Sequence, residues 1–347
     1  MQKNHILDLS YKELASHLSS MGEKSFRATQ IFEAIYQNNV LHFKDIRNLP
    51  EVLKKHLEEE FVFDCPDVLG MQVSVDKTQK ILFELKDKEA IETVIIPTEN
   101  RVTLCVSTQA GCKHGCRFCA SGLGGFKRNL TCAEIIGQIL YVKNLLKGKQ
   151  DLSHIVFMGV GEPLDNYDNL LKSIRIINAP QGLHIGARRI TISTCGLVDK
   201  IEQLSKESLQ MELSISLHAS NDSVRRELMP IAQKYPLYRL IRACQDYVKK
   251  TNRQITFEYL LIRNKTCTVQ AAKELKGLLK GLLCKMNLIL YNEVKEFPYQ
   301  VPTTEEINMF KDVLLRFGIH ATFRRPRGRD IAAACGQLRY QKKENSR

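Results

Sequence analysis

Three cysteines that stand close together in the sequence have the type and spacing needed to hold an inorganic cofactor. Cys112, Cys116 and Cys119 form a C-x3-C-x2-C triplet. Three thiolates on one tight loop can bind three irons of a [4Fe–4S] cube and leave the fourth iron without a protein ligand. An open iron can bind a small molecule, and this turns an electron-transfer cluster into a catalyst.

Zinc binding and plain burial are the two alternatives for these thiols. Structural zinc takes four tetrahedral ligands, and catalytic zinc takes three plus water. His114 lies inside the triplet and Cys105 precedes it, so either could complete a zinc site. Free cysteine also packs as a small hydrophobic residue, which would make the three thiols inert. The spacing favours the iron–sulfur cluster, and both alternatives stay open at this point.

Length and composition predict an ordinary globular protein of about two domains. The chain has 347 residues, of which 44% are hydrophobic and 26% charged. No run approaches the ~18 uninterrupted apolar residues of a membrane span, and the first residues lack the apolar region of a signal peptide. Eleven cysteines without such a signal predict a reducing cytoplasm, and metal or catalytic thiols rather than a disulfide framework.

Basic residues outnumber acidic residues only outside the amino-terminal region. The whole chain carries a net charge of +13, whereas residues 1–65 hold eight basic and ten acidic residues, which leaves +15 for the remainder. This uneven excess indicates a polyanionic partner, most simply nucleic acid, although charge that serves only solubility is the alternative. Arginine favours phosphate because its planar fork bonds bidentately. Two local clusters fit that role: Lys127-Arg128, and Arg324, Arg325, Arg327 and Arg329.

The pattern of apolar residues predicts three structural regions followed by a basic tail. Residues 1–65 have the three- and four-residue spacing of helices and form a helical accessory domain, whereas residues 66–98 alternate like strands and form a β extension. Across residues 99–338 short apolar strands alternate with helices, which predicts a parallel sheet with helices outside, as a full or partial barrel. Residues 339–347 form the tail.

The expected elements can be given by residue range. Thr131 and Glu134 form a capping box at the start of the clearest helix, 131–147. The other expected helices are 11–20, 25–39, 51–61, 168–178, 236–250, 268–283 and 304–317. The expected strands are 71–75, 81–85, 91–96, 102–106, 155–158, 190–194, 213–217, 256–262, 286–291 and 321–324. Chemistry in such folds gathers at the carboxyl ends of the strands, and the cysteine loop directly follows strand 102–106.

Glycines and polar residues follow several other strands. Met158-Gly-Val-Gly-Glu-Pro163 would let a ligand approach the backbone closely, although a plain turn is the simpler interpretation of this motif alone. Cys335 stands among alanines and a glycine, which leaves room for a bulky group to reach its sulfur, and a buried inert thiol is the alternative. Four residues at equivalent strand ends indicate a site for a polar ligand: Ser193, Ser216, His218 and Asn292.

Together these residues resemble the radical S-adenosylmethionine enzymes, and among them the RlmN type, the adenine carbon-2 methyltransferases of ribosomal and transfer RNA. The wider likeness rests on the triplet, with Phe118 before its last cysteine, and on the Gly-Glu-Pro after the next strand. The RlmN likeness covers essentially the whole chain, with Ser121 and Cys195 as mild departures. It rests on the segments Glu92–Pro97, Leu104–Cys112, Gly125–Leu130, Ser216–His218 and Ala334–Leu338.

The resemblance implies a fold and two cofactor sites. The fold would be α/β, a partial (β/α)6 radical-SAM barrel with a small helical N-terminal accessory domain and a short antiparallel β extension. Cys112, Cys116 and Cys119 would hold one [4Fe–4S] cluster, whose open iron binds S-adenosyl-L-methionine. The pocket of that molecule would be lined by Gly161, Glu162, Ser193, Ser216, Leu217, His218 and Asn292.

The resemblance also implies a mechanism. Carbon 2 of adenine is too electron-poor to attack a methyl sulfonium, so radical chemistry is needed. One S-adenosylmethionine would methylate Cys335 by displacement, and a second would yield a 5′-deoxyadenosyl radical that removes hydrogen from the new S-methyl group. The resulting carbon radical adds to carbon 2, where Glu92 accepts the proton. Cys105 then attacks Cys335, and the transient disulfide frees the product.

Two of these roles make demands on the fold. The disulfide requires the α carbons of Cys105 and Cys335 to approach to roughly 7 Å or less. Glu92 must point inward, whereas a lone glutamate usually faces solvent. Glu92 shares a strand face with Val94 and Ile96, which is consistent with an inward direction.

The implied partners are 23S ribosomal RNA (domain V, the peptidyl transferase region), transfer RNA at the adenine 3′ of the anticodon, and a flavodoxin-type electron donor. The protein would act as a cytoplasmic monomer without a membrane, on a base flipped out of its stack. Three alternatives remain: a Cfr-type carbon-8 methyltransferase, a non-catalytic RNA-binding module built on zinc, and a radical activase acting on protein. Pro163 and the segment 95–97 favour the carbon-2 type, and the basic excess and Cys335 disfavour the activase.

Overall fold

The computed structural model describes residues 3–339, and its centre is one ten-stranded sheet. The strands are β3 (Asp67–Val73), β4 (Gln79–Glu84), β5 (Ala90–Pro97), β6 (Val102–Cys105), β9 (Leu152–Phe157), β10 (Ile190–Thr194), β11 (Glu212–Ser216), β12 (Ile255–Leu261), β13 (Cys284–Leu290) and β14 (Ala321–Arg324). Their order is β14-β13-β12-β11-β10-β9-β6-β5-β4-β3. The strands from β6 to β14 run parallel, and β5, β4 and β3 extend the sheet antiparallel. This confirms the expected α/β fold; within residues 3–339 no pairing joins β14 to β3, so the barrel is partial.

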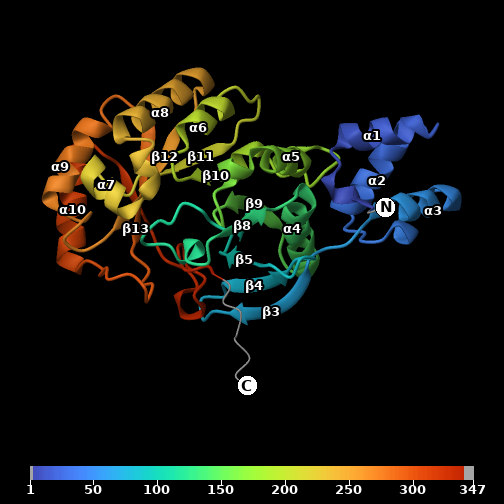
Figure 1. Ribbon diagram of the computed structural model, residues 1–347, viewed down its shortest axis with the longest axis horizontal. Coiled ribbons are helices and arrows are strands. Elements are labelled where there is room, and N and C mark those ends of the chain that lie inside the picture. Colours follow the sequence, from blue (N-terminus) through green and yellow to red (C-terminus); the bar gives the residue numbers. More distant parts are fainter. Residues whose placement is uncertain (1–2, 340–347) are drawn as a thin grey trace.

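Helices follow the parallel strands and cover the outer face of the curved sheet (Figure 1). They are α4 (Cys132–Leu146), α5 (Tyr167–Asn178), α6 (Val198–Leu204), α7 (Asp222–Leu228), α8 (Leu237–Thr251), α9 (Val269–Leu278) and α10 (Thr304–Arg316). Short 3-10 turns lie at Ile6–Asp8, Phe43–Asp45, Ala120–Gly122, Pro163–Asn166, Ala187–Arg189, Pro230–Gln233 and Arg329–Ile331. Among residues 3–339, no helix is long and apolar enough to cross a lipid bilayer.

The amino-terminal helices pack beside α4 and α5, at one end of the molecule in Figure 1. They are α1 (Tyr11–Ser20), α2 (Phe26–Tyr36) and α3 (Glu51–Glu60), and a short parallel pair, β1 (Asn4–His5) with β2 (Phe61–Val62), ties their two ends together. The Lys143 ammonium of α4 donates to the carbonyl oxygens of Tyr36 and Gln37 at 2.7 Å each. This contact attaches the end of α2 to the sheet domain.

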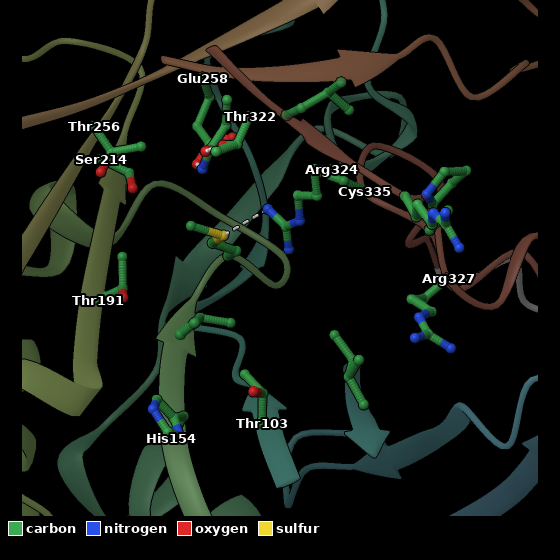
Figure 2. Close-up of a pocket in the computed structure, with 18 of the residues that line it drawn as sticks. Thr103, His154, Thr191, Ser214, Thr256, Glu258, Thr322, Arg324, Arg327 and Cys335 are labelled. Atoms are coloured by element: carbon green, nitrogen blue, oxygen red, sulfur yellow. Dashed lines mark hydrogen bonds between the residues drawn. The ribbon is translucent and has the colours of Figure 1, made fainter. Parts of the chain in front are cut away.

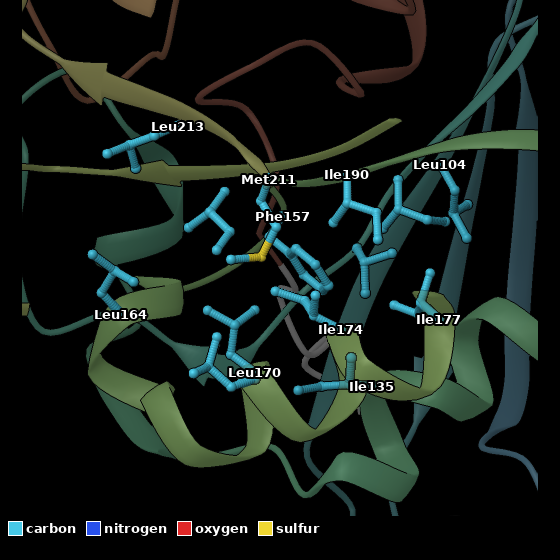
Figure 3. Packing of buried hydrophobic residues seen from close by; sticks show 14 of the residues in the cluster. Leu104, Ile135, Phe157, Leu164, Leu170, Ile174, Ile177, Ile190, Met211 and Leu213 are labelled. Carbon is cyan, nitrogen blue, oxygen red and sulfur yellow. The ribbon is translucent and has the colours of Figure 1, made fainter. Parts of the chain in front are cut away.

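Side chains along each strand point alternately to the outer face of the sheet, where the helices pack, and to the inner face, which borders the cavity. On β9 and β10 the residues Ile155, Phe157, Ile190 and Ile192 are buried and point outward. Figure 3 shows Phe157 and Ile190 among the side chains of Ile135, Ile174 and Ile177, which α4 and α5 contribute. The residues between them, such as Thr191, point inward and are half-buried. The period of two therefore predicts which side chains face the inner cavity.

A buried glutamine of α4 fixes the chain just after β6. The Gln138 side chain is fully buried, and its Oε1 accepts from Thr93 Oγ1 at 2.6 Å and from the Ser107 N–H at 3.0 Å. Its Nε2 donates to the Ser107 carbonyl at 3.1 Å. Ser107 Oγ in turn donates to the Glu92 carbonyl at 2.6 Å. One side chain thus joins α4, β5 and the start of the cysteine loop.

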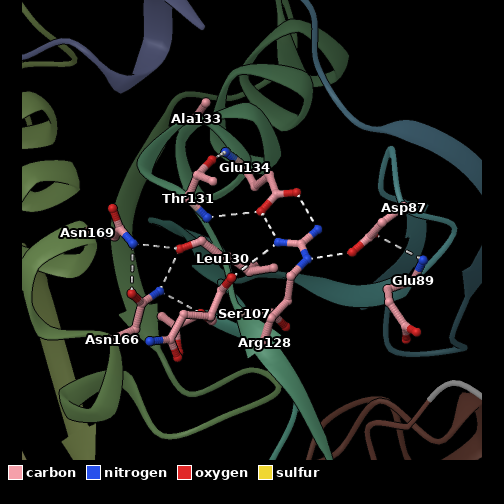
Figure 4. Close-up of polar contacts among 12 residues, drawn as sticks. Asp87, Glu89, Ser107, Arg128, Leu130, Thr131, Ala133, Glu134, Asn166 and Asn169 are labelled. Carbon is pink, nitrogen blue, oxygen red and sulfur yellow. Dashed lines mark hydrogen bonds and ion pairs between the residues drawn. The ribbon is translucent and has the colours of Figure 1, made fainter. Parts of the chain in front are cut away.

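A two-stranded ribbon that the sequence analysis did not predict borders the cysteine loop. It pairs β7 (Gln109–Gly111) with β8 (Phe126–Asn129). Arg128 on β8 bonds both oxygens of Glu134, at 2.7 and 2.8 Å, and its Nε donates to Asp87 at 2.5 Å (Figure 4). The guanidinium is therefore engaged within the protein, contrary to the expectation that Arg128 binds phosphate, whereas Lys127 is exposed. The expected Thr131–Glu134 capping box beside it is present.

Of the tail expected at 339–347, only Arg339 belongs to the described residues, and it pairs with Glu296. The other expected basic cluster is divided between two environments. Arg325 and Arg327 are exposed, whereas Arg324, the last residue of β14, is half-buried. The Arg329 Nε donates to Asn292 Oδ1 at 2.8 Å, and Arg327 Nη1 lies 3.9 Å from Asp76 Oδ2. Arg325 and Arg327 are the exposed members available to an outside anion, and Asp76 competes for Arg327.

Replacing Gln138 by Leu tests the buried network. The change removes the hydrogen-bond partner of the Ser107 N–H, the Ser107 C=O and the Thr93 hydroxyl. Because these groups are buried, we expect the free energy of unfolding to fall by about 3 kcal/mol. Urea denaturation followed by circular dichroism would measure this. The exposed Gln150→Leu serves as the control and should cost less than about 0.5 kcal/mol. Equal small losses in both variants would contradict the assigned role.

Candidate active site

The cysteine triplet lies on a loop whose shape depends on glycine. Gly111 has φ +75°, and a Cβ there would meet the Gly125 carbonyl oxygen at 1.9 Å. The Cys112 N–H donates to that same oxygen at 3.0 Å, and the Cys119 N–H donates to the Cys116 carbonyl at 3.1 Å. These bonds fold the segment into a compact turn between β7 and β8. All three cysteines line one cavity of about 140 Å³.

The three thiols fit an iron–sulfur cluster better than one metal ion. Burial raises the pKa of Cys112 to about 12 and that of Cys116 well above its ordinary value, and the neighbouring thiols add to both shifts. Within residues 3–339, however, no three His, Cys, Asp or Glu side chains converge as ligands of a single ion. Sulfurs at the corners of a cluster stand further apart than the ligands of one ion, and soft thiolates suit iron–sulfur clusters.

The residues that would have completed a zinc site are engaged elsewhere. His114 Nε2 bonds Asp165 Oδ2 at 2.7 Å, and Lys113 pairs with the other oxygen at 3.0 Å. Cys105 ends β6 and lies in a separate buried cluster with Val94 and Ala333. The alternative of a zinc knuckle therefore loses its two proposed fourth ligands.

The Gly-Val-Gly-Glu-Pro motif forms a constrained wall of the same cavity. A Cβ on Gly161, at φ +103°, would meet the Gln109 side chain at 2.5 Å. The Glu162 carboxylate is buried and accepts from the backbone N–H groups of Leu164 at 3.0 Å and Cys195 at 2.7 Å. Burial raises the pKa of Glu162, and these two bonds oppose the rise. Glu162 thereby ties the loop after β9 to the loop after β10.

The strand-end residues predicted as a ligand site divide between two cavities. Ser193, Ser216 and His218 line the 140 Å³ cavity together with the cysteines. Leu217 is fully buried in the hydrophobic core, so only its backbone is near the site. Asn292 lies in a neighbouring cavity of about 670 Å³, where its Nδ2 donates to the Cys335 carbonyl at 3.0 Å.

His218 is held as a neutral ring. Burial, and the charge of Arg225, lower the pKa of His218 to about 3. Its Nδ1 accepts from the Leu260 N–H at 3.1 Å, which assigns the ring proton to Nε2. The ring meets Phe118 of the cysteine loop edge-on at 4.8 Å. The neutral imidazole therefore presents one hydrogen-bond donor to the cavity.

Cys335 lies on the wall between the two cavities and borders both. The segment after it is fastened to the cysteine loop, because the Ala120 N–H donates to the Gly336 carbonyl and Ser121 Oγ donates to the Leu338 carbonyl, each at 2.7 Å. Protein atoms crowd the thiol and raise its pKa, while Arg324 opposes the rise. The residue is nevertheless exposed, because the open cavities leave its surface accessible.

The two cysteines proposed to pair are brought together, although 230 positions separate them. Cys105 packs with Ala333 and Leu338, the residues on either side of Cys335. Burial raises the pKa of Cys105 to about 12, and the charge of Cys335 adds to this effect. Both thiols are free. The fold thus places Cys105 against the segment that carries Cys335, and a disulfide between the two thiols stays a prediction.

Glu92 points inward. Its side chain is 3% exposed, Lys80 Nζ pairs with Oε1 at 3.0 Å, and Oε2 has no hydrogen-bond partner within residues 3–339. Burial raises the pKa of Glu92, and the Lys80 ammonium limits the rise. Two positions further along β5, Val94 stands opposite Cys105 in the strand register. The carboxylate therefore lies on the same sheet face as the Cys105 thiol.

Sequence reasoning missed Glu258 as a lining residue of the larger cavity and the inward direction of Arg324. It also missed Lys80, the ion-pair partner of Glu92. Figure 2 shows Arg324 and Glu258 directed into this cavity with Thr191, Ser214 and Thr256. Arg324 Nη1 contacts the Met158 sulfur at 3.4 Å, and Glu258 Oε1 accepts from Asn287 at 3.1 Å. The available signal was a polar residue at every second position of a strand, which marks the cavity face.

Comparisons with known proteins agree along the whole chain. A family described as "Radical SAM superfamily" matches residues 106–266, and one described as "Ribosomal RNA large subunit methyltransferase N-terminal domain" matches residues 4–63. A protein of Clostridium tetani described as "Probable dual-specificity RNA methyltransferase RlmN" is 47% identical and covers 99% of this chain and 97% of its own length. One of Dictyoglomus turgidum with the same description is 46% identical, with 97% of each chain covered. The crystal structure of a radical SAM methyltransferase from Sphaerobacter thermophilus superposes with a TM-score of 0.92 at 40% identity, covering 97% and 99%.

Replacing Lys80 by Met tests the buried ion pair. The folded-state pKa of Glu92 lies above the ordinary value of 4.5, so its contribution to stability is full below that value and is lost as pH rises through the folded pKa. Without Lys80 the ionised carboxylate is buried alone. We expect the free energy of unfolding to fall by about 3 kcal/mol at roughly pH 8 and by less at roughly pH 5.

Urea denaturation of the wild type and Lys80→Met at both pH values would measure this. The control is the double variant Lys80→Met/Glu92→Gln, in which the loss should no longer depend on pH. A loss in Lys80→Met that is the same at both pH values would contradict the pairing.

Proposed function

The chain belongs to the RlmN family of radical SAM RNA methyltransferases, and from this premise we propose that it methylates carbon 2 of adenine in two RNAs. The substrates are 23S ribosomal RNA, in the peptidyl transferase region of domain V, and transfer RNA, at the adenine 3′ of the anticodon. The observation that carries the proposal is the position of Cys335 between two cavities. A thiol in that position can take a group from one cavity and deliver it into the other.

We assign both cofactors to the smaller cavity, because the cysteine loop and the residues at the strand ends line it. Its cysteine loop would hold a [4Fe–4S] cluster through Cys112, Cys116 and Cys119. When bound, the cluster supplies the electron that splits S-adenosylmethionine and so provides the radical that carbon 2 requires. The proposed residues around S-adenosylmethionine are Gly161, Glu162, Ser193, Ser216, Leu217, His218 and Asn292. Asn292 would contact S-adenosylmethionine next to Cys335, since the Asn292 amide donates to the Cys335 carbonyl oxygen.

The larger cavity fits the flipped nucleotide. Its volume of about 670 Å³ lies within the usual range of small-molecule sites, and polar side chains line it. The exposed Arg325 and Arg327 also line it, where they can bond the phosphates on either side of an extruded base. The nucleobase would then meet Cys335 at the inner end of the cavity.

Three residues of the chain carry the methyl transfer. Cys335 loses its proton and takes the methyl group of one S-adenosylmethionine by displacement. After the methyl carbon of Cys335 has added to carbon 2, Glu92 accepts the proton of that carbon, a role for which an inward carboxylate with one free oxygen is suited. Cys105, as a thiolate, then attacks the Cys335 sulfur. The electron pair of the broken carbon–sulfur bond passes to the methylene carbon, which takes a proton and becomes the methyl group of the product. The RNA is released, and Cys105 and Cys335 are left joined as a disulfide. The next cycle requires an external reductant, and a flavodoxin-type donor is proposed for the cluster.

The Cfr-type reaction at carbon 8 is the second candidate, because the same two thiols would serve it. Pro163 and the Ile95-Ile96-Pro97 segment favour carbon 2. Mass spectrometry and NMR of nucleosides from the modified RNA distinguish the two products. Methylation found at carbon 8 alone would replace the proposal.

Removing the acceptor thiol tests the mechanism. In anaerobic turnover with methyl-labelled S-adenosylmethionine, we expect Cys335→Ala to lose methyl transfer to RNA by at least about 10³-fold, because no other group can carry the methyl carbon. Cys65→Ala, which changes a thiol outside both cavities, should retain wild-type turnover. Methylated adenine formed by Cys335→Ala at the normal rate would overturn the thiol-carrier role.

The basic excess predicts a strong dependence of RNA binding on salt. If roughly 6 phosphates are engaged, affinity for a transfer RNA should fall about a thousandfold between about 50 and 200 mM salt, because binding releases condensed counterions. Fluorescence anisotropy across this range would measure the slope. The double variant Arg325→Gln/Arg327→Gln should reduce the slope by about 2. A response that does not change with salt would remove the phosphate-contact interpretation.

A further inference from the structure

Arg225 on α7 is a charged side chain with no exposed surface. Its guanidinium donates only to backbone carbonyl oxygens. The bonds run from Nε to Leu217 at 3.3 Å, from Nη1 to Tyr235 at 3.3 Å, and from Nη2 to Cys195 at 2.8 Å and Ser216 at 3.3 Å. These carbonyls belong to the loops after β10 and β11 and to the turn before α8. One side chain thereby joins the strand-end loops that line the smaller cavity.

Arg225 has no carboxylate partner within the part of the chain that the structure describes. Among residues 3–339, no carboxylate oxygen lies within 4.0 Å of the Arg225 guanidinium, the limit for a salt bridge. Asp222, the nearest acid along the helix, accepts from the Leu237 N–H at 2.8 Å instead. Burial lowers the pKa of Arg225, yet a guanidinium keeps its proton in proteins. The charge of Asp222 acts on Arg225 without a bond between the two side chains. A buried charge that is not directly paired costs several kcal/mol, so a further anion nearby would stabilise Arg225.

Arg225 lies directly behind the wall of the smaller cavity. Its Nη2 bonds the carbonyl oxygens of Cys195 and Ser216, and these two residues line that cavity together with the three cysteines. The end of α7 also touches the cysteine loop, because the Arg117 N–H, next to Cys116, donates to the Leu228 carbonyl at 2.8 Å. The anion that would stabilise Arg225 is therefore the cluster proposed for the cysteine loop.

We propose that Arg225 is the fixed counter-charge of the iron–sulfur site and raises the reduction potential of its cluster. This inference rests on the proposed cluster. Three thiolates outweigh the positive charge of an oxidised cluster core, and one-electron reduction adds a further negative charge without a proton. A buried cation stabilises the reduced form more than the oxidised form, and net charge is one determinant of cluster potential. Arg225 thus eases delivery of the electron from a weak external donor.

The simpler alternative is a purely structural role, in which Arg225 only joins the loops through its hydrogen bonds. Two pairs of variants distinguish the effect of its charge from this structural role. Arg225→Lys keeps the charge and Arg225→Gln removes it, and both lose most of the carbonyl bonds. Cys244, a fully buried neutral thiol of α8 within electrostatic range of Arg225, offers the reverse change. Cys244→Asp would place a carboxylate beside an intact Arg225, and Cys244→Ser is its neutral control.

The experiment is an EPR-monitored redox titration of anaerobically reconstituted full-length protein, with iron and sulfide measured for each variant. In Arg225→Gln and Cys244→Asp the equilibrium constant for cluster reduction should fall at least tenfold, about 59 mV for one electron. In Arg225→Lys and Cys244→Ser it should stay within about threefold of the wild type. The Cys244 pair keeps the test decisive if Arg225→Gln does not fold.

Potentials that shift equally in the charged and neutral members of each pair, or in none of them, would overturn the counter-charge. Wild-type protein that binds no iron and sulfide after reconstitution would instead refute the proposed cluster. The two failures are therefore distinguishable.

Discussion

The geometry of the site depends on the hydrogen bonds that join the carboxyl-terminal segment to the cysteine loop. Two bonds, from Ala120 to Gly336 and from Ser121 to Leu338, place Cys335 beside the cysteine turn. A Cβ on Gly336 would lie only 3.2 Å from the Phe118 carbonyl, so the two backbones approach as closely as glycine permits. Short main-chain bonds position the thiol more firmly than a contact between flexible side chains would. The sheet contributes the other half of the constraint, because it brings Cys105 under the same segment.

The structure also holds three charged side chains away from water. Glu92, Glu162 and Arg225 are each nearly or fully withdrawn from water, and each is held by bonds that fix its direction. Glu162 and Arg225 both bind the backbone of Cys195, since Glu162 accepts from its N–H and Arg225 donates to its carbonyl. Such groups reduce the stability of the free protein. Their retention around a single site is what a preorganised electrostatic environment requires.

The sequence was informative where a local rule determines the structure. The alternation of strands and helices predicted the parallel sheet, and the Thr131–Glu134 pair predicted the start of α4. The spacing of the three cysteines predicted the tight turn that carries them. The β7–β8 ribbon was missed because it is short and glycine-rich and has no apolar alternation. The carboxylate partners of Arg128 and the inward direction of Arg324 were missed because they depend on residues brought together only by the fold. Nothing in the sequence near Arg225 distinguishes it from an exposed helical arginine.

The hydrogen bonds between the carboxyl-terminal segment and the cysteine turn also matter for the order in which the chain is synthesised. The cysteine turn leaves the ribosome long before Cys335 does, since six of the ten strands of the sheet, β9 to β14, are encoded between them. A nascent or truncated chain that ends before residue 335 lacks both the proposed acceptor thiol and the bonds that Gly336 and Leu338 make to the cysteine turn. The site is therefore completed only at the end of translation.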